Sequence, residues 1–376
     1  MNKAAQRILI VGGGFSGMAA AIQLRKANLQ VDLVEIGREW SSYGAGITLG
    51  GASLRALKTL GLLDEFLRRG FAGDGLDLIT PNGHPIGRVP TPRVAGPDVP
   101  GGAAIMRPVL AQIMSEATRA SGTRVLLDCT FQSLEPRDAG VQVRLTNGET
   151  GIYDLVIGAD GLNSKLRAAI FPAAAGPAYS GQGVWRAVLR RPPGLDTPRM
   201  WLGGPVKPGV SPVSASHMYM YVTENRAQRA KVDTAEFPAL LAALLEGFTD
   251  PMLIEIRNSL SASSQIVYRP LEGLLLPLPW HAGNIVLIGD AIHATTPHLA
   301  SGACIGMEDA IVLADEVGKP VPLESALESF ERRRWERCRM VVQNSLRLGQ
   351  IEIEGGDMKE HAGIMRDSIM SLSSPL

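Results

Sequence analysis

A glycine-rich turn near the N-terminus constrains this chain more than any other feature. Residues 12–17 read GGGFSG, follow the apolar segment RILIV at 7–11, and open a helix-forming stretch at 17–28. A second apolar segment, VDLVEI, follows at 31–36. This order predicts a strand–turn–helix–strand unit of the kind that binds dinucleotides. A membrane span or signal peptide is a poorer interpretation, because the uncharged stretch at 8–24 is short and carries four glycines.

Each glycine of the motif has a physical role in such a unit. Gly12 permits the tight turn, Gly14 lets a pyrophosphate approach the backbone, and Gly17 lets helix and strand pack closely. Glu35 ends the second strand, where a carboxylate can accept hydrogen bonds from ribose hydroxyls. The alternative is a glycine turn in any α/β protein, and the motif alone does not distinguish FAD from NAD.

The pattern of polar and apolar residues changes twice along the chain. From about 174 to 276, short segments with alternating polarity predict an antiparallel sheet inserted between α/β parts. Helical stretches are expected at 51–69, 107–120 and from about 302 to 348. The repeated return to α/β patterns predicts one interleaved architecture with no separate linker.

Charge and cysteine content exclude several classes of protein. Lys+Arg and Asp+Glu both number 37, so the net charge is zero, which argues against nucleic acid or an anionic membrane as the main partner. The three cysteines, Cys129, Cys304 and Cys338, form no CxxC motif, which excludes a disulfide scaffold and a zinc ribbon. We therefore expect a cytoplasmic protein without a metal site.

Two later motifs resemble those of a known family. Residues 154–167 read DLVIGADGLNSKLR, and residues 285–310 read IVLIGDAIHATTPHLASGACIGMEDA. With GGGFSG, they follow the order and spacing found in the single-component FAD-dependent aromatic hydroxylases, the group around p-hydroxybenzoate hydroxylase. The resemblance covers nearly the whole chain.

The resemblance implies an α/β fold with a Rossmann-like FAD-binding domain of the GR2 type, an inserted antiparallel-sheet substrate domain and C-terminal helices. The expected FAD-binding domain is discontinuous, the substrate domain has two pieces, and a helical segment closes the chain. Their expected bounds are 1–72, 101–173 and 277–318 for the first, 73–100 and 174–276 for the second, and 319–376 for the third.

The same resemblance assigns the cofactor ligands. Asp290 corresponds to the aspartate that binds the ribityl chain, Arg107 to the family arginine, and Asp160 to the aspartate linked to FAD and nicotinamide handling. The helix that opens near Gly302 is expected under the isoalloxazine, where its amides stabilise negative charge. The full expected set is Gly12, Gly14, Phe15, Ser16, Gly17, Glu35, Arg107, Asp160, Asp290, Pro297, Gly302 and Ala303.

The implied reaction is hydroxylation of a phenolic or hydroxy-N-heteroaromatic ring. NADH or NADPH reduces FAD, O2 adds to form a flavin C4a-hydroperoxide, and electrophilic oxygen passes to the ring. The sequence has no second GxGxxG, so the nicotinamide nucleotide is expected to bind only transiently. The expected partner is a small aromatic substrate, and the protein is expected to be a monomer or homodimer.

A segment of the inserted sheet supplies the expected catalytic groups. In SASHMYMYVTE, two-residue alternation places His217, Tyr219 and Tyr221 on one face. The His217/Tyr221 pair resembles that of hydroxylases of 3-hydroxybenzoate and 6-hydroxynicotinate. His298, next to Pro297 in the loop expected to contact the flavin (the flavin loop), resembles a pocket histidine of the 6-hydroxynicotinate enzymes. His217 would be the base, Tyr221 a relay or a second candidate base, and His298 a ligand for a carboxylate or carbonyl. Expected substrate contacts are Thr48, Arg186 and Tyr219; plain packing is the alternative for this face.

Three other interpretations stay open. The C-terminal tail and SPVSAS at 211–216 resemble flavin-dependent urate hydroxylase, while GITL at 46–49 and MYMY at 218–221 resemble quinolone monooxygenases. A urate, purine or quinolone substrate is therefore an alternative within the family. An alternative of another class is a flavoprotein reductase or oxidase that inserts no oxygen.

Overall fold

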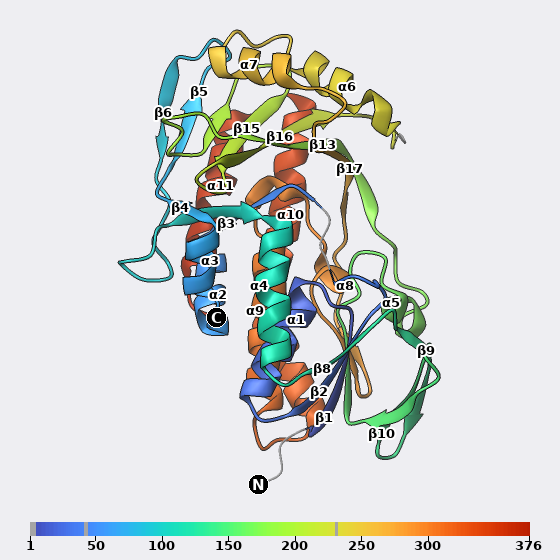
Figure 1. Ribbon diagram of the computed structural model, residues 1–376. Helices are drawn as coiled ribbons and strands as arrows, with labels where there is room; N and C mark the ends of the chain where they lie inside the picture. Colours follow the sequence, from blue (N-terminus) through green and yellow to red (C-terminus); the bar gives the residue numbers. More distant parts are fainter. Residues whose placement is uncertain (1–4, 41–43, 230–231) are drawn as a thin grey trace.

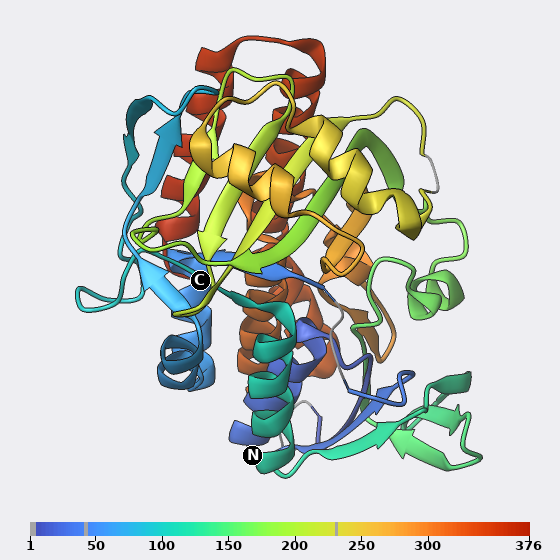
Figure 2. The ribbon, with the colours of Figure 1, turned by 45° about the horizontal axis from the view of Figure 1, so that its top comes forward.

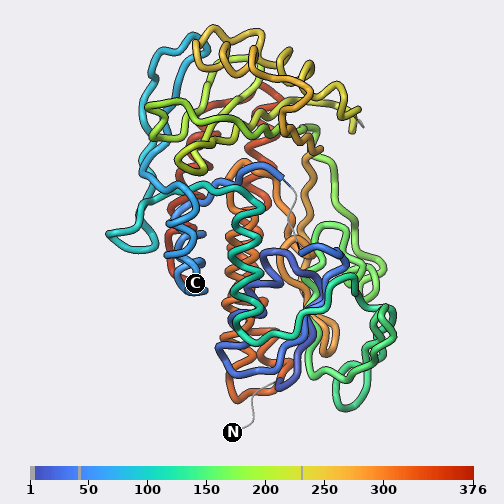
Figure 3. The backbone as a smooth tube through the Cα atoms, in the orientation of Figure 1, coloured from blue at the N-terminus to red at the C-terminus, as the bar shows by residue number. Residues whose placement is uncertain are grey.

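The computed structural model describes residues 5–40, 44–229 and 232–376. Figure 1 shows a sheet layer at the top, covered by the yellow helices α6 and α7, and a second α/β layer below it. The red helix α10 reaches from the lower layer to the upper one, and the smooth tube of Figure 3 follows the chain between the two layers several times. The two layers are therefore built from interleaved pieces of sequence.

The lower layer contains a six-stranded sheet that begins with the predicted unit. β1 (Arg7–Val11) pairs in parallel with β2 (Gln30–Glu35), and α1 (Phe15–Lys26) connects them. The prediction of a strand–turn–helix–strand unit is confirmed. The sheet order is β18-β19-β12-β1-β2-β8, completed by β8 (Arg124–Leu127), β12 (Leu155–Gly158), β18 (His281–Ala282) and β19 (Ile285–Leu287).

Apolar side chains on both faces explain why this sheet is largely parallel. The strand residues 8–11 and 155–158 are buried, as expected where helices cover both faces. α9 (Gly302–Val317) packs on α1, and α4 (Arg107–Ala120) packs on its other side. The shorter α5 (Lys165–Ile170), α8 (Asp290–His293) and the 3-10 helix η2 (Pro297–Leu299) follow strands of the sheet and its adjoining loops.

The upper layer is a seven-stranded sheet with the order β17-β13-β16-β15-β14-β5-β6. Its neighbours are antiparallel, except that β14 pairs in parallel with β5. The exception arises because β5 and β6 come from a separate excursion of the chain that joins the sheet at its edge. The strands are β5 (Leu76–Ile79), β6 (Pro85–Val89), β13 (Ala178–Arg190), β14 (Arg199–Trp201), β15 (Lys207–Pro212), β16 (His217–Asn225) and β17 (Ile266–Gly273).

The two faces of this sheet have different roles. Met218, Met220 and Val222 pack with α6 (Phe237–Leu244) and α7 (Pro251–Ser259) into a separate apolar core. Tyr219 and Tyr221 alternate with them and face the lower layer. Figure 2, with the top turned forward, shows α6 and α7 lying across the sheet on the outer side.

Two small three-stranded sheets complete the fold. β3 (Gly46–Gly50), β7 (Gly102–Met106) and β4 (Phe71–Gly73) lie between the layers. β9 (Phe131–Arg137), β10 (Gly140–Leu145) and β11 (Thr150–Tyr153) form the other, beside the lower layer. The chain turns between β10 and β11 at Gly148, whose φ is +90°.

Several helical stretches are divided where the sequence predicted continuity. The stretch at 51–69 becomes α2 (Gly51–Leu60) and α3 (Leu63–Arg69), because Gly61 adopts φ +75°. The predicted run at 302–348 breaks after Val317, and a segment with two prolines separates α9 from α10 (Leu323–Glu354). The short η1 (Thr234–Glu236) precedes α6.

The C-terminal helix α11 (Met358–Ser373) folds back along the molecule from the end of α10. It packs on α10, α2 and η2. In the described parts of the chain, no helix combines the length and apolar character needed to cross a membrane.

Candidate active site

The glycine turn leaves open space at only one of its key positions. A β-carbon at Gly12, where φ is +108°, would lie 2.3 Å from the carbonyl oxygen of Ala159. One at Gly17 would lie 2.0 Å from the Gly12 carbonyl oxygen. At Gly14 nothing lies within 4 Å. Gly12 and Gly17 are therefore required for packing, whereas Gly14 leaves the start of α1 open to a ligand.

Glu35 stands beside this turn at the carboxyl end of β2. Its Oε2 accepts a hydrogen bond of 2.7 Å from the Gly13 amide, and its Oε1 accepts one of 2.8 Å from the Gly37 amide. These bonds fix the carboxylate while leaving lone pairs for ribose hydroxyls.

A cavity of about 800 Å³ extends from the turn to the upper sheet. It draws its walls from both layers, from the 290–304 segment and from α11. The predicted residues that line it are Gly14, Phe15, Ser16, Thr48, Arg107, Arg186, Tyr219, Tyr221, Asp290, Pro297, His298, Gly302 and Ala303. Those that do not are Gly12, Gly17, Glu35, Asp160 and His217.

Asp290 begins α8 and faces this cavity. Its carboxylate makes no hydrogen bond within the described residues, although Arg107 and His293 lie close enough to lower its pKa. Burial has the larger effect and raises the pKa of the carboxyl. Gly289 makes this approach possible, since a β-carbon there would lie 2.3 Å from Ser16 Oγ.

Asp160 lies behind the cavity wall instead of facing it. Its Oδ1 accepts a 2.5 Å hydrogen bond from Ser164 Oγ, and its Oδ2 accepts one of 3.0 Å from the Leu166 amide. Arg167 then donates to the Ala291 carbonyl at 2.8 Å. The carboxylate thus orders the loop that begins α5 and holds it beside the Asp290 turn.

The cavity floor toward the upper sheet is formed by two tyrosines. Tyr219 and Tyr221 have ring centroids 5.8 Å apart, and the Tyr219 hydroxyl forms a short hydrogen bond with Thr48 Oγ1. Burial raises the pKa of both phenols. At neutral pH they are therefore hydrogen-bond donors and acceptors, and neither is suited to be a base.

His217 does not join these tyrosines at the cavity. The alternation that the sequence predicted places Tyr219 and Tyr221 there, but His217 is the first residue of β16, two positions before Tyr219. Its side chain is exposed, with Nδ1 2.8 Å from Ser216 Oγ. Each two-residue step moves a side chain about 7 Å, which carries His217 beyond the cavity edge.

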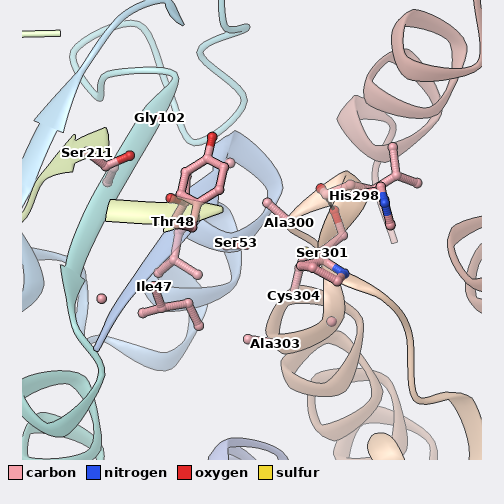
Figure 4. Close-up of a pocket in the computed structure, with 18 of the residues that line it drawn as sticks. Ile47, Thr48, Ser53, Gly102, Ser211, His298, Ala300, Ser301, Ala303 and Cys304 are labelled. Carbon is pink, nitrogen blue, oxygen red and sulfur yellow. Dashed lines mark hydrogen bonds between the residues drawn. The ribbon is translucent and has the colours of Figure 1, made fainter. Parts of the chain in front are cut away.

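His298 is buried and turned toward α10. Its Nδ1 lies 2.9 Å from Thr296 Oγ1, and its Nε2 lies 3.4 Å from Glu352 Oε2. Figure 4 draws Thr48 and His298 on opposite sides of the Ala300–Ser301 segment. The imidazole thus reaches the cavity from behind the flavin loop and not from the sheet.

Arg186 brings an unpaired positive charge to the cavity. Within the described residues it forms no hydrogen bond and no ion pair. Burial lowers the pKa of its guanidinium, Arg107 and Arg269 lower it further, and Tyr219 opposes the shift. Arg186 pairs in register with Tyr221, so the two side chains lie beside each other on the cavity face.

Several cavity residues belong to no motif in the sequence. Lys207 and Arg269 come from strands whose single charges look like solvated positions, and neither belongs to a motif. The wall from α11 includes Met365, Ile369 and Leu372, whose helical spacing could have indicated a buried stripe.

A buried charged cluster supports the 285–310 segment from below. His293 Nε2 lies 2.5 Å from Asp309 Oδ2, and Arg334 Nε donates to Asp309 Oδ1 at 2.9 Å. Asp309, His293 and Cys338 lie close enough to hold a metal ion. However, the Arg334 guanidinium also lies 3.5 Å from Cys338 Sγ, so a cation already faces these groups.

Comparison with known proteins identifies the family to which this site belongs. The sequence profile described as the FAD binding domain matches residues 5–345. The chain belongs to this family of FAD-dependent monooxygenases.

Curated relatives cover most of this monooxygenase. It is 32% identical to the 2-heptyl-3-hydroxy-4(1H)-quinolone synthase of Pseudomonas aeruginosa over 92% of this chain and 90% of that protein. It is 30% identical to the aurachin C monooxygenase/isomerase of Stigmatella aurantiaca, covering 92% and 89%. The FAD-dependent urate hydroxylase of Klebsiella pneumoniae is 24% identical, covering 94% and 92%.

Solved structures agree on the fold. Klebsiella pneumoniae HpxO in complex with FAD and uric acid superposes with a TM-score of 0.85 at 22% identity, over 98% of this chain and 97% of that one. Pseudomonas aeruginosa PqsL with 2-aminobenzoylacetate gives 0.82 at 22% identity, over 96% and 99%. The chain is a flavin-dependent aromatic monooxygenase with FAD as its cofactor, as predicted.

The residues present fit FAD. The open space at Gly14 suits a pyrophosphate at the start of α1, and the unpaired Asp290 carboxylate suits the hydroxyls of a ribityl chain. α9 begins at Gly302 on the cavity wall, after Ala300 in the left-handed conformation with φ +48°. Its first amides carry positive potential toward the place where a reduced isoalloxazine would be negative.

Proposed function

We propose that this enzyme hydroxylates a small phenolic or hydroxy-N-heteroaromatic substrate and takes electrons from NADH or NADPH. When bound, FAD would accept electrons from the nicotinamide nucleotide and activate O2, from which one oxygen atom enters the ring and the other leaves as water. The single observation that carries the proposal is the cavity itself. It extends from the loops at Gly14 and Asp290, which fit FAD, to a floor formed by Tyr219, Tyr221 and the unpaired Arg186.

The protein's own residues would bind and polarise the ring. Tyr219 is held by Thr48, and Tyr221, whose hydroxyl has no hydrogen-bond partner within the described residues, would bind a ring hydroxyl. Arg186 beside Tyr221 would stabilise negative charge on that oxygen. A positive charge within about 4–6 Å lowers the pKa of a hydroxyl by roughly 1–3 units, which makes the ring more electron-rich.

Water exclusion is the second contribution of the fold. The tyrosine floor, the small sheet and α11 all contribute walls to the cavity, so a ring bound at the floor would contact protein on several sides. Such enclosure protects a reactive oxygen species from side reactions with water. His217 lies outside this enclosure, and we assign it no part in the reaction.

The comparisons support a choice among ring systems. Relatives at 30–32% identity are a 2-heptyl-3-hydroxy-4(1H)-quinolone synthase and an aurachin C monooxygenase/isomerase, and the urate hydroxylase, at 24%, is less similar. Quinolones therefore join hydroxybenzoates and hydroxynicotinates as substrates to test, with urate as a further candidate. We place the enzyme in the cytoplasm as a monomer or homodimer.

The test is a substrate screen with the purified flavoprotein. Each ring compound is added with NADH or NADPH, and nucleotide oxidation, product and incorporation of ¹⁸O from O2 are measured. We expect one class to stimulate nucleotide oxidation with ¹⁸O in the product. If NADH or NADPH is oxidised but no ring compound gains ¹⁸O, the enzyme is instead a reductase or oxidase.

A further inference from the structure

A polar chain leads from the cavity wall into the interior through Thr296, His298 and Glu352. Thr296 and His298 both line the cavity, and Thr296 Oγ1 lies 2.9 Å from His298 Nδ1. On the other side of the ring, His298 Nε2 lies 3.4 Å from Glu352 Oε2. This separation is an ion-pair distance, and the buried Nε2 has no hydrogen-bond partner among the described residues.

Glu352 is held in place from several elements. Its carboxylate accepts hydrogen bonds from Lys207 on β15 and, at 3.1 Å, from His361 on α11. Asn225 Nδ2 donates to its backbone carbonyl at 3.3 Å. Burial alone would raise the pKa of this carboxyl, but His298, His361 and the charge of Lys207 hold the pKa well below its usual range. Glu352 is therefore ionised and can only accept hydrogen bonds.

An ionised Glu352 determines which ring nitrogen of His298 carries the hydrogen. Nε2 lies 3.4 Å from the Glu352 carboxylate, whose negative charge favours the tautomer that carries the hydrogen on Nε2. Nδ1 then presents its lone pair to the Thr296 hydroxyl. Burial, the charge of Lys207 and His361 lower the pKa of His298, and Glu352 opposes them, so the imidazole is neutral at pH 7 and free to accept a proton.

We propose that Thr296 and His298 take the proton of the substrate's ring hydroxyl, and that Glu352 is the positioning residue that makes this possible. The substrate O–H bond breaks and its proton passes to Thr296 Oγ1, while the original Thr296 hydroxyl proton passes to His298 Nδ1. The products of the step are a ring oxyanion, a restored threonine hydroxyl and an imidazolium beside the Glu352 carboxylate. No electrons are transferred.

This inference rests on the proposed function. It also identifies a base for the reaction, because none of the other predicted catalytic groups can serve as one. Of the predicted catalytic groups, His217 lies outside the cavity and the raised pKa of Tyr221 makes it a poor base. Asp290 is the only carboxylate that lines the cavity among the described residues, and it is suited to FAD. Among the described residues, His298 is the one imidazole that lines the cavity, and Thr296 is its hydrogen-bond partner there.

Three variants test the relay in the FAD-loaded enzyme. Thr296→Val removes the hydroxyl but keeps the shape, and we expect the coupled hydroxylation rate to fall about 10²-fold. Thr296→Ser should restore most of it. Glu352→Gln removes the charge that stabilises the imidazolium, so we expect a lower rate and an acidic limb of the pH–rate profile that moves to lower pH. Glu354→Gln, on the exposed side of the same helix end, is the control.

The outcomes distinguish a failure of the proposed proton relay from a failure of the proposed hydroxylase function. A wild-type enzyme that hydroxylates no ring in the substrate screen contradicts the proposed function. An active wild type with unchanged rates and pH profiles in Thr296→Val and Glu352→Gln contradicts the relay alone. A direct readout needs no substrate: histidine ¹⁵N NMR of the holoenzyme, assigned with His298→Asn, should show the Nε2–H tautomer for His298. The Nδ1–H tautomer would overturn the proposal.

Discussion

Gly46 lies directly against the ring of Tyr219. A β-carbon at Gly46 would come within 2.1 Å of Tyr219 Cδ1, so β3 reaches the upper sheet only because this residue has no side chain. The same approach brings Thr48, two residues farther along β3, to the Tyr219 hydroxyl. One glycine therefore sets the distance between the two layers at the cavity floor.

Gly46→Ala should displace Tyr219 and damage the substrate end of the cavity. We expect a loss of about 1–3 kcal/mol in unfolding free energy, because an added methyl group overpacks the contact. FAD should still bind, while product formed per NAD(P)H consumed should fall. Chemical denaturation, bound-flavin absorbance and product analysis measure these effects. Gly87→Ala is the control, since nothing lies within 4 Å of a β-carbon there; equal coupling in both variants would contradict this role.

Gly12 and Gly14 should respond differently to alanine. Gly12→Ala meets the Ala159 carbonyl and a φ of +108°, so we expect a destabilised fold with a lower Tm. Gly14 has φ −72° and open space, so Gly14→Ala should keep the Tm of the apoprotein. Its added methyl group would nevertheless occupy the space assigned to the pyrophosphate, so FAD should bind more weakly. Apoprotein Tm and FAD titration decide; tight FAD binding by Gly14→Ala would argue against that placement.

Arg186→Met should raise the pKa of a ring hydroxyl bound in the cavity by about 1 unit or more, because it removes the unpaired charge. Hydroxylation should slow, and Arg186→Lys should recover part of it. The ultraviolet spectrum of the bound substrate, followed against pH, reports its ionisation. Arg190→Met on the same strand is the matched control, because Arg190 is exposed and lies outside the cavity. An unshifted substrate titration would remove Arg186 from this role.

Asp309→Asn should destabilise the fold by about 3–5 kcal/mol, because it leaves the buried His293 without its carboxylate and the buried Arg334 with Glu308 alone. Asp315→Asn, an exposed change on the same helix, is the control. Urea unfolding at neutral pH measures both.

The same carboxyl should govern acid stability. Burial opposes ionisation, but His293 and Arg334 lower the pKa of Asp309 to about 2. A depressed pKa contributes stability that is present above the ordinary value near 4 and lost as the pH falls toward 2. The wild type should lose stability in this window, and Asp309→Asn should lack that component. His293 has the opposite sign: Asp309 holds its pKa well above the usual range, against burial, so its contribution is lost as the pH rises.

The sequence by itself determined the parts of this protein that depend on local geometry. The GGGFSG turn, the βα unit around it and the Asp290 turn follow from glycine positions and apolar periods within a few residues of each other. Few residue types can adopt a positive φ or allow a close backbone contact, so the sequence alone predicts the backbone turn at these positions. The alternation in β16 likewise placed Tyr219 and Tyr221 on one face.

Tertiary structure decided which side chains meet in the cavity. Alternation fixes the face of His217 but not the edge of the cavity, which depends on where β3 crosses the sheet. The partner of His298 lies 54 positions away, on a helix whose end is set by Gly355 in the left-handed conformation, and the carboxylate there is shared with β15 and α11. Contacts between segments so distant in the chain arise because whole helices and strands pack together. No local pattern in the sequence predicts them.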